Sequence, residues 1–254
     1  MLEVTSLYCG YDKEMIIKNV SFVANRKENL CIVGPNGSGK STLLKSIGNL
    51  LGYKGRITLD NTDINTFTRS DLAKRIAILS QISTIHFPYT IYETVALGRY
   101  AHMKNSRLSL NKEDKDIIFE SLRMVGLLEI KDTYINNLSG GQLQRVFLAR
   151  TFAQNPEVIL LDEPTNHLDL KYQIEILEYL KKWSEENDKI LISVLHDLNL
   201  VNIFSDKVIV LNNGEIAEIG DTKKVLSSKM LNEAYNMDIR NFMINSLKKW
   251  EGNK

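Results

Sequence analysis

The sequence GPNGSGKST, residues 34–42, fits the phosphate-binding loop pattern G-x-x-x-x-G-K-[ST]. Its glycines allow the backbone to curl until successive N–H groups point inward as a nest for an anion. Lys40 can reach the β- and γ-phosphates of a nucleotide, and the Ser41 hydroxyl can ligate Mg²⁺. The loop therefore predicts a binding site for a nucleoside triphosphate. The residues that we assign to this phosphate-binding loop are Gly34, Pro35, Asn36, Gly37, Ser38, Gly39, Lys40, Ser41 and Thr42.

The segments on either side of the loop agree with this interpretation. Residues 29–33 (NLCIV) form an apolar run typical of a buried strand, and residues 42–50 have the pattern of a helix. The N-terminus of such a helix adds partial positive charge to an anion site. A chance Gly/Ser-rich turn is the alternative, but it would not require a strand before it and a helix after it.

Composition limits the classes of function. Of the 254 residues, 43% are hydrophobic and 25% are charged, which is ordinary for a globular protein. The 32 Lys and Arg residues nearly balance the 31 Asp and Glu residues, so the chain lacks the basic surplus of a nucleic-acid-binding protein. Two cysteines, Cys9 and Cys31, are too few for a metal site and favour a reducing, cytosolic environment. No apolar run is long enough to span a bilayer, so we expect any membrane role to come through a partner.

The chain changes its pattern along its length. Hydrophobic alternation in residues 2–8, 15–24 and 56–60 predicts an antiparallel sheet built around the start of the chain. Helical periodicity replaces the short strands over about residues 82–155, where we expect a helical lobe inserted into an α/β core. The sequence of the tail, residues 226–254, favours helix, and we assign no chemical role to it.

Acidic residues follow one further strand-like run. Asp162 and Glu163 come directly after the apolar residues 158–161. An aspartate at that position suits water-mediated ligation of Mg²⁺, and the adjacent glutamate can polarise a water for attack on a γ-phosphate. Two carboxylates that simply face solvent are the alternative.

Three other polar or aromatic residues are candidates by their position. Gln81 and His196 each follow a strand-like run, and ligands of α/β folds bind at the carboxyl ends of strands. His196 could hydrogen-bond a γ-phosphate oxygen. Tyr11, in the first expected turn, could stack on a purine base. The alternatives are a solvated glutamine, a structural histidine and a partly buried turn tyrosine.

Taken together, these motifs resemble the ATPases of ABC transporters. The LSGGQ sequence at residues 138–142 is specific to that superfamily, and the other motifs occur in the family's order. The resemblance covers about residues 1–225. It implies an α/β fold with a P-loop NTPase core, an N-terminal antiparallel β subdomain and the inserted helical lobe.

The family resemblance also implies a role for each matching residue. Two ATP molecules would be sandwiched between two copies of the chain, arranged head to tail. Catalysis would depend on Glu163, His196, Gln81 and Lys40, and Mg²⁺ would be held by Ser41, Gln81 and Asp162. Tyr11 would stack on adenine, and Asp169 would lie in a loop that communicates across the dimer. The residues that would complete the γ-phosphate site of the other copy are Ser139, Gly140, Gly141 and Gln142.

A finer resemblance points to one subfamily. VALGRYAHM (95–103), TNHLDLKYQIEIL (165–177) and LHDLNL (195–200) look like ATPase subunits of iron-siderophore, haem and cobalamin importers. The chain departs from that subfamily where Ala101 replaces a proline, and where Leu143 and Tyr172 replace a frequent Arg and His. The resemblance implies a peripheral position on the cytoplasmic face of the membrane. The partners would be integral-membrane permease subunits and, indirectly, an external substrate-binding protein.

Within the lobe, residues 82–100 would form the groove that receives a permease helix. Their sequence FPYTIYETV (87–95) mixes aromatic and aliphatic residues, as a docking surface does, although it also suits ordinary lobe core.

Two other members of the superfamily are alternatives. One is a soluble ABC ATPase that acts on nucleic acid or ribosomes, but such proteins usually carry a long coiled coil or two cassettes in one chain. The other is an exporter cassette, which is often fused to a membrane domain. Charge balance and the single short cassette favour the importer, with no nucleic-acid partner.

Overall fold

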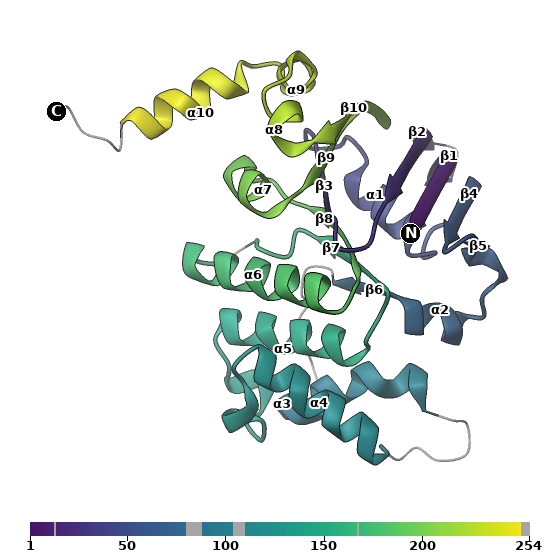
Figure 1. Ribbon diagram of the computed structural model, residues 1–254, viewed down its shortest axis with the longest axis vertical. Helices are drawn as coiled ribbons and strands as arrows, with labels where there is room; N and C mark the ends of the chain where they lie inside the picture. Colours follow the sequence, from purple (N-terminus) through teal and green to yellow (C-terminus); the bar gives the residue numbers. More distant parts are fainter. Residues whose placement is uncertain (13, 80–87, 104–109, 167, 250–254) are drawn as a thin grey trace.

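The computed structural model describes residues 1–12, 14–79, 88–103, 110–166 and 168–249 (Figure 1). Within these residues a small antiparallel sheet has the strand order β2-β1-β4-β5. Its strands are β1 (Leu2–Tyr11), β2 (Glu14–Ala24), β4 (Tyr53–Leu59) and β5 (Thr62–Asp63). The antiparallel sheet expected around the start of the chain is thereby confirmed.

The larger sheet has the order β10-β9-β3-β8-β7-β6 and is parallel except for its edge strand β10. Its strands are β3 (Asn29–Val33), β6 (Ile76–Leu79), β7 (Val158–Asp162), β8 (Ile190–Val194), β9 (Lys207–Asn212) and β10 (Glu215–Asp221). Parallel strands joined by helices are the arrangement expected of a P-loop NTPase core, so the predicted fold class is confirmed.

Helices cover both faces of this sheet and form the far end of the molecule (Figure 1). The α-helices are α1 (Lys40–Ile47), α2 (Arg69–Arg75), α3 (Ile91–Ala96), α4 (Lys112–Met124), α5 (Gly140–Ala153), α6 (Leu170–Glu186), α7 (Leu198–Phe204), α8 (Thr222–Val225), α9 (Lys229–Tyr235) and α10 (Ile239–Lys248). The short 3₁₀ helices are η1 (Ile64–Thr66), η2 (Leu97–His102), η3 (Leu128–Ile130) and η4 (Ile135–Asn137). None of the described helices is long and apolar enough to cross a bilayer.

Successive side chains of the central strand β3 point alternately into two layers of the apolar core. Leu30 and Ile32 point into the layer shared with α1 and the antiparallel sheet. Cys31 and Val33 point into the layer shared with α3 to α6. All four side chains are fully buried, as expected for a strand with helices or sheet on both faces. Because the strand is fixed on both sides, the loop that follows Val33 starts from a rigid point.

The helices α3, α4 and α5 pack together at the end of the molecule opposite α1 (Figure 1). An ion pair between Arg99 Nε and Asp114 Oδ1, 2.9 Å apart, is buried inside this group. Arg99 also donates to the carbonyl of Ala153, the last residue of α5. Asp114 also completes a capping box with Asn111 at the start of α4. Polar groups thus join η2, which directly follows α3, to α4 and α5.

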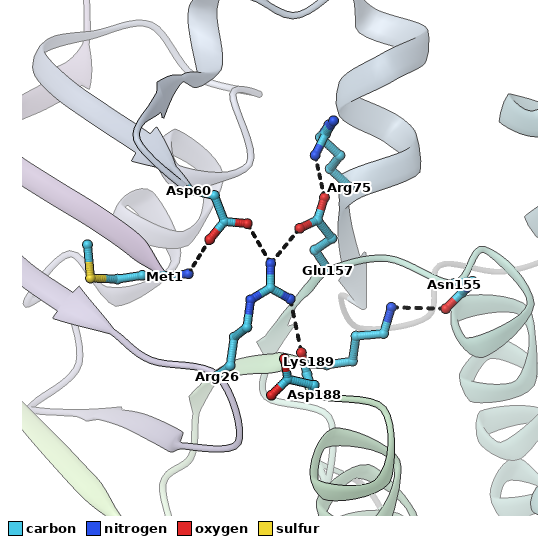
Figure 2. Close-up of polar contacts among 8 residues, drawn as sticks. All are labelled: Met1, Arg26, Asp60, Arg75, Asn155, Glu157, Asp188 and Lys189. Carbon is cyan, nitrogen blue, oxygen red and sulfur yellow. Dashed lines mark hydrogen bonds and ion pairs between the residues drawn. The ribbon is translucent and has the colours of Figure 1, made fainter.

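A second polar cluster joins the two sheets at the amino ends of the parallel strands (Figure 2). Arg26 lies between β2 and β3, and its guanidinium bonds to Asp60 of the β4–β5 turn and to Glu157 just before β7. Glu157 also binds Arg75, the last residue of α2. The cluster therefore ties the antiparallel sheet to the strand that carries Asp162.

The boundaries and faces of two helices are well defined. Helix α1 begins at Lys40 rather than at the expected residue 42, because Gly39 already adopts a left-handed conformation as its N-cap. The buried face of α6 includes Leu177, Leu180 and Trp183, whereas Ile174 is 41% exposed. The Trp183 indole stacks on Phe152 of α5 with 5.4 Å between ring centroids, and this contact joins the two helices.

Candidate functional site

Three neighbouring strands end at the same place. The sheet order places β8 between β3 and β7, so the loops after these strands lie side by side. The phosphate-binding loop follows β3, Asp162 ends β7, and His196 follows β8. The Ser41 hydroxyl donates a hydrogen bond of 2.9 Å to Asp162 Oδ1, across 121 positions of the chain. The fold thus brings these sequence-predicted residues together at one sheet edge.

The phosphate-binding loop has the backbone that its glycines were expected to permit. Gly34, Gly37 and Gly39 have φ angles of 151°, 80° and 102°. A Cβ atom at Gly34 would lie 2.0 Å from the carbonyl oxygen of Leu211, so no other residue fits there. The hairpin between β9 and β10 also supports the loop, since Gly214 N donates to Ser38 O at 3.1 Å.

Lys40 is held inside the curl of the loop. Its Nζ donates 2.9 Å hydrogen bonds to the carbonyl oxygens of Gly34 and Pro35, and the residue is only 6% exposed. Burial lowers the pKa of Lys40, whereas the negative charges of Glu163 and Asp162 oppose this shift. The ammonium group is therefore fixed where a phosphate would enter the curl.

Asp162 and Ser41 supply oxygen donors of the kind that Mg²⁺ prefers. Burial raises the pKa of Asp162, the hydrogen bond from Ser41 lowers it, and the neighbouring charge of Glu163 raises it further. A nearby cation would therefore stabilise the ionised carboxylate. Among the described residues no group of three or more His, Cys, Asp or Glu side chains could hold a metal ion. Two protein oxygen donors suit an ion that takes its other ligands from water and nucleotide phosphates, and Mg²⁺ usually binds proteins in that way.

Glu163 has a strained backbone and a fixed side chain. Its φ of 55° lies in the left-handed region that glycine favours, and its N–H donates to Val194 O at 3.2 Å. One carboxylate oxygen, Oε1, accepts a hydrogen bond from His196 Nε2. The other, Oε2, accepts one from Asn166 Nδ2. Strain of this kind concentrates at functional sites, and the two bonds set the direction of the carboxylate.

The LSGGQ sequence forms a capped helix start. Ser139 is the N-cap of α5: its hydroxyl accepts from Gln142 N at 3.3 Å, and its own N–H donates to Gln142 Oε1 at 3.0 Å. Gly141 packs on the ring of Tyr172, which a Cβ atom would approach to 3.0 Å. Ser139 and Gly140 are exposed. In the part of the chain that the structure describes, the hydrogen bonds of Ser139 stay within this turn and do not reach the phosphate-binding loop.

Other predicted residues are exposed or cannot be placed. Tyr11 is the last residue of β1, paired with Glu14, rather than part of a turn, and its side chain is 45% exposed. Asp169 is an exposed N-cap of α6 that makes no side-chain capping bond. Gln81 lies outside the described residues, as do residues 82–87 of the expected docking groove.

Further residues contact the site without having been predicted. Gln144, on the buried face of α5, donates from Nε2 to Pro164 O at 3.0 Å and so links the LSGGQ helix to the loop after Glu163. A glutamine at a core position of a helix could have signalled such a bond. Asn166 lies in a stretch noted only for its family resemblance. No local sequence pattern could have indicated Tyr235, because its partner Gly34 is 201 positions away.

Known proteins match the chain over most of its length. The family described as ABC transporter matches residues 17–166. The petrobactin import ATP-binding protein YclP of Bacillus subtilis (strain 168) is 35% identical over 240 residues, which are 94% of each chain.

Solved structures have the same fold. A metal-chelate type ABC transporter in an inward-facing conformation aligns with a TM-score of 0.80 at 26% identity, over 92% of this chain and 88% of that one. A dimeric ATP-binding cassette bound to ADP and Pi, in a post-hydrolysis state, aligns with a TM-score of 0.74 at 32% identity, over 88% of this chain and 100% of that one. This chain therefore belongs to the ABC transporter family and is one of its ATP-hydrolysing cassettes.

Proposed function

We propose that the protein hydrolyses Mg²⁺-bound ATP as a head-to-tail dimer and thereby powers import of a metal chelate, most simply an iron-siderophore. The observation that carries the chemistry is the fixed carboxylate of Glu163 beside the Ser41–Asp162 pair. The observations that carry the transport role are the import protein and the metal-chelate transporter that the chain resembles.

The reaction follows from the side chains at the sheet edge. The phosphate-binding loop holds the β- and γ-phosphates with backbone N–H groups, and Lys40 neutralises their charge. Ser41 and Asp162 would hold Mg²⁺, which supplies further neutralisation of the phosphate oxygens when bound. Glu163 orients a water in line with the γ-phosphorus and accepts its proton as the O–P bond forms and the bond to ADP breaks.

His196 and Asn166 keep the Glu163 carboxylate aimed during this step, because each occupies one of its oxygens. A further lone pair on each oxygen stays available to accept from water. His196 is exposed, so its ring can also turn toward a γ-phosphate oxygen. Tyr11 and Gln81 keep their expected roles in this proposal, as the adenine-stacking residue and the γ-phosphate sensor.

A second copy of the chain would complete the site. The Ser139 turn offers a helix N-terminus with two glycines, which suits close approach to a phosphate. Among the residues that the structure describes, its hydrogen bonds do not connect it to the loop of its own chain, and one similar cassette has been solved as a dimer with ADP and Pi. We assign Ser139, Gly140, Gly141 and Gln142 to the partner's ATP, with Asp169 at the dimer contact.

The proposal also divides the chain into a cassette, an inserted helical lobe and a tail. Residues 1–225 would form the cassette, with the helical lobe at about residues 82–155, and residues 226–254 the tail. The lobe would dock on integral-membrane permease subunits at the cytoplasmic face of the membrane. An external binding protein would deliver substrate to the permease, without touching this chain.

The test is a pull-down of tagged Glu163→Gln protein from its native cells, in ATP and mild detergent. We expect a polytopic permease among the bound proteins, and growth on single iron chelates should then fail in cells that lack it. Ribosomal or DNA-bound partners without a membrane protein would overturn the import role and leave the ATPase chemistry standing.

A further inference from the structure

The first glycine of the phosphate-binding loop is held by a tyrosine from the C-terminal tail. Gly34 N donates a hydrogen bond to the hydroxyl oxygen of Tyr235, with an N···O distance of 3.0 Å. Tyr235 is the last residue of α9, and its ring packs against the apolar layer that contains Cys31 and Val33. The apolar residues of α1 pack on the opposite side of the strand, so the tyrosine supports the loop from behind.

Gly34 depends on this partner because its surroundings leave little room to move. The residue is buried, and Leu211 O lies so close that even a methyl group would clash. A buried N–H that loses its acceptor costs free energy unless the backbone shifts to find another. Any such shift would also move Gly34 O, which accepts the hydrogen bond from Lys40 Nζ. The tyrosine hydroxyl is thereby connected to the lysine that meets the phosphates.

Helix α9 is itself firmly placed, so Tyr235 is not a loose contact. Leu231 is fully buried, and the Ser228 hydroxyl caps the helix by accepting from Leu231 N at 3.2 Å. At the other end, Asn232 Oδ1 accepts from Ile239 N at 3.0 Å and fixes the turn into α10. Burial raises the pKa of Tyr235, so its hydroxyl remains neutral.

We propose that Tyr235 is a positioning residue for nucleotide binding: its hydroxyl fixes the Gly34 end of the phosphate-binding loop, and α9 is thereby part of the nucleotide site. The inference rests on nucleotide binding by the loop and adds to it a residue that no loop pattern contains. It gives the tail a role in binding, because a displacement of α9 would remove the acceptor from Gly34.

The test is Tyr235→Phe in the full chain, which removes the hydroxyl and keeps the ring that packs on the core. Calorimetric titration with ADP and Mg²⁺ should show roughly 2- to 10-fold weaker binding, the range expected for one lost hydrogen bond. Amide exchange measured by NMR should become faster at Gly34. The matched control is Tyr53→Phe, whose hydroxyl accepts from Asn65 Nδ2 at 2.9 Å in the antiparallel sheet. It should leave both quantities at the parental values.

Three outcomes would count against the inference. Parental ADP affinity in Tyr235→Phe would overturn it, and so would equal losses of affinity in Tyr235→Phe and Tyr53→Phe, which would indicate general destabilisation. Unchanged amide exchange at Gly34 in Tyr235→Phe would show that the tyrosine hydroxyl does not hold the Gly34 N–H group. If instead the parental chain failed to bind ADP, the proposed ATPase function would fall together with this inference.

Discussion

His196 Nε2 lies 2.5 Å from Oε1 of Glu163, although the two residues are 33 positions apart and follow different strands of the sheet. The contact exists because β7 and β8 are parallel neighbours that end at the same edge. It joins a carboxylate that can accept a proton from water to an imidazole that can orient it. Because Asn166 bonds the other oxygen, the Glu163 carboxylate is held in one orientation and cannot rotate freely.

Glu163→Gln should lower the ATP turnover number at least about 100-fold, because an amide cannot accept the proton of the attacking water. ATP affinity should stay near the parental value, since Lys40 and the loop backbone are untouched. Steady-state phosphate release and equilibrium titration with ATP measure the two quantities. Glu178→Gln, an exposed change on α6, is the control. Parental turnover in Glu163→Gln would exclude this residue as the base.

The same variant should accumulate as an ATP-bound dimer, because the closed state can no longer be opened by hydrolysis. Size-exclusion chromatography with and without ATP measures this. A monomer at all ATP concentrations would contradict the proposed sandwich, provided that titration shows ATP to be bound.

Lys40→Ala should weaken ATP binding by roughly 10- to 100-fold, the range for a lost hydrogen bond to a charged group. The reason is that Lys40 Nζ, now directed into the loop by Gly34 O and Pro35 O, is the cation closest to the expected phosphates. Lys45→Ala, an exposed lysine of the same helix, should bind ATP as the parent does. Equal affinities of the two variants would refute the assignment of the loop.

Ser139 serves two purposes that two variants can separate. Ser139→Ala should lower the free energy of unfolding by about 1 kcal/mol, because the N-cap of α5 is lost. It should also lower ATP turnover without weakening ATP binding by the isolated chain. Ser139→Asn keeps a good cap, so stability should return while turnover stays low. Recovery of both in Ser139→Asn would mean that Ser139 acts only as a cap.

Local patterns predicted the α/β core, the antiparallel sheet and the neighbourhood of Ser41 and Asp162, whereas the full fold class came from the family resemblance. A glycine-rich loop between an apolar run and a helix has few structural solutions, and acidic residues after an apolar run end a buried strand. Because carboxyl ends of parallel strands gather at one edge, the proximity of Ser41, Asp162 and Glu163 followed from the fold class.

The remaining features depend on contacts that no local pattern records. Tyr11 lies in a strand because the β1–β2 hairpin pairs to its end, beyond the alternation seen in residues 2–8. The stacking of Trp183 on Phe152 joins two separate helices, so no pattern within α6 alone indicates it. Tyr235 reaches Gly34 only because α9 packs against β9 and β10, late in the chain.

Glu157→Gln should lower the free energy of unfolding by about 1–2 kcal/mol, because charge-assisted bonds to two arginines become weaker bonds to a neutral amide. Glu157 Oε2 lies 2.7 Å from Arg26 Nη2, Oε1 binds Arg75, and the side chain is only 23% exposed, so water screens the pairs incompletely. The loss should shrink in 1 M salt. Glu120→Gln breaks an exposed pair with Arg123 on α4 and should cost less than about 0.5 kcal/mol. Urea unfolding of the variants at low and high salt gives all of these values. Equal losses in Glu157→Gln and Glu120→Gln would show that the cluster does not hold the two sheets together.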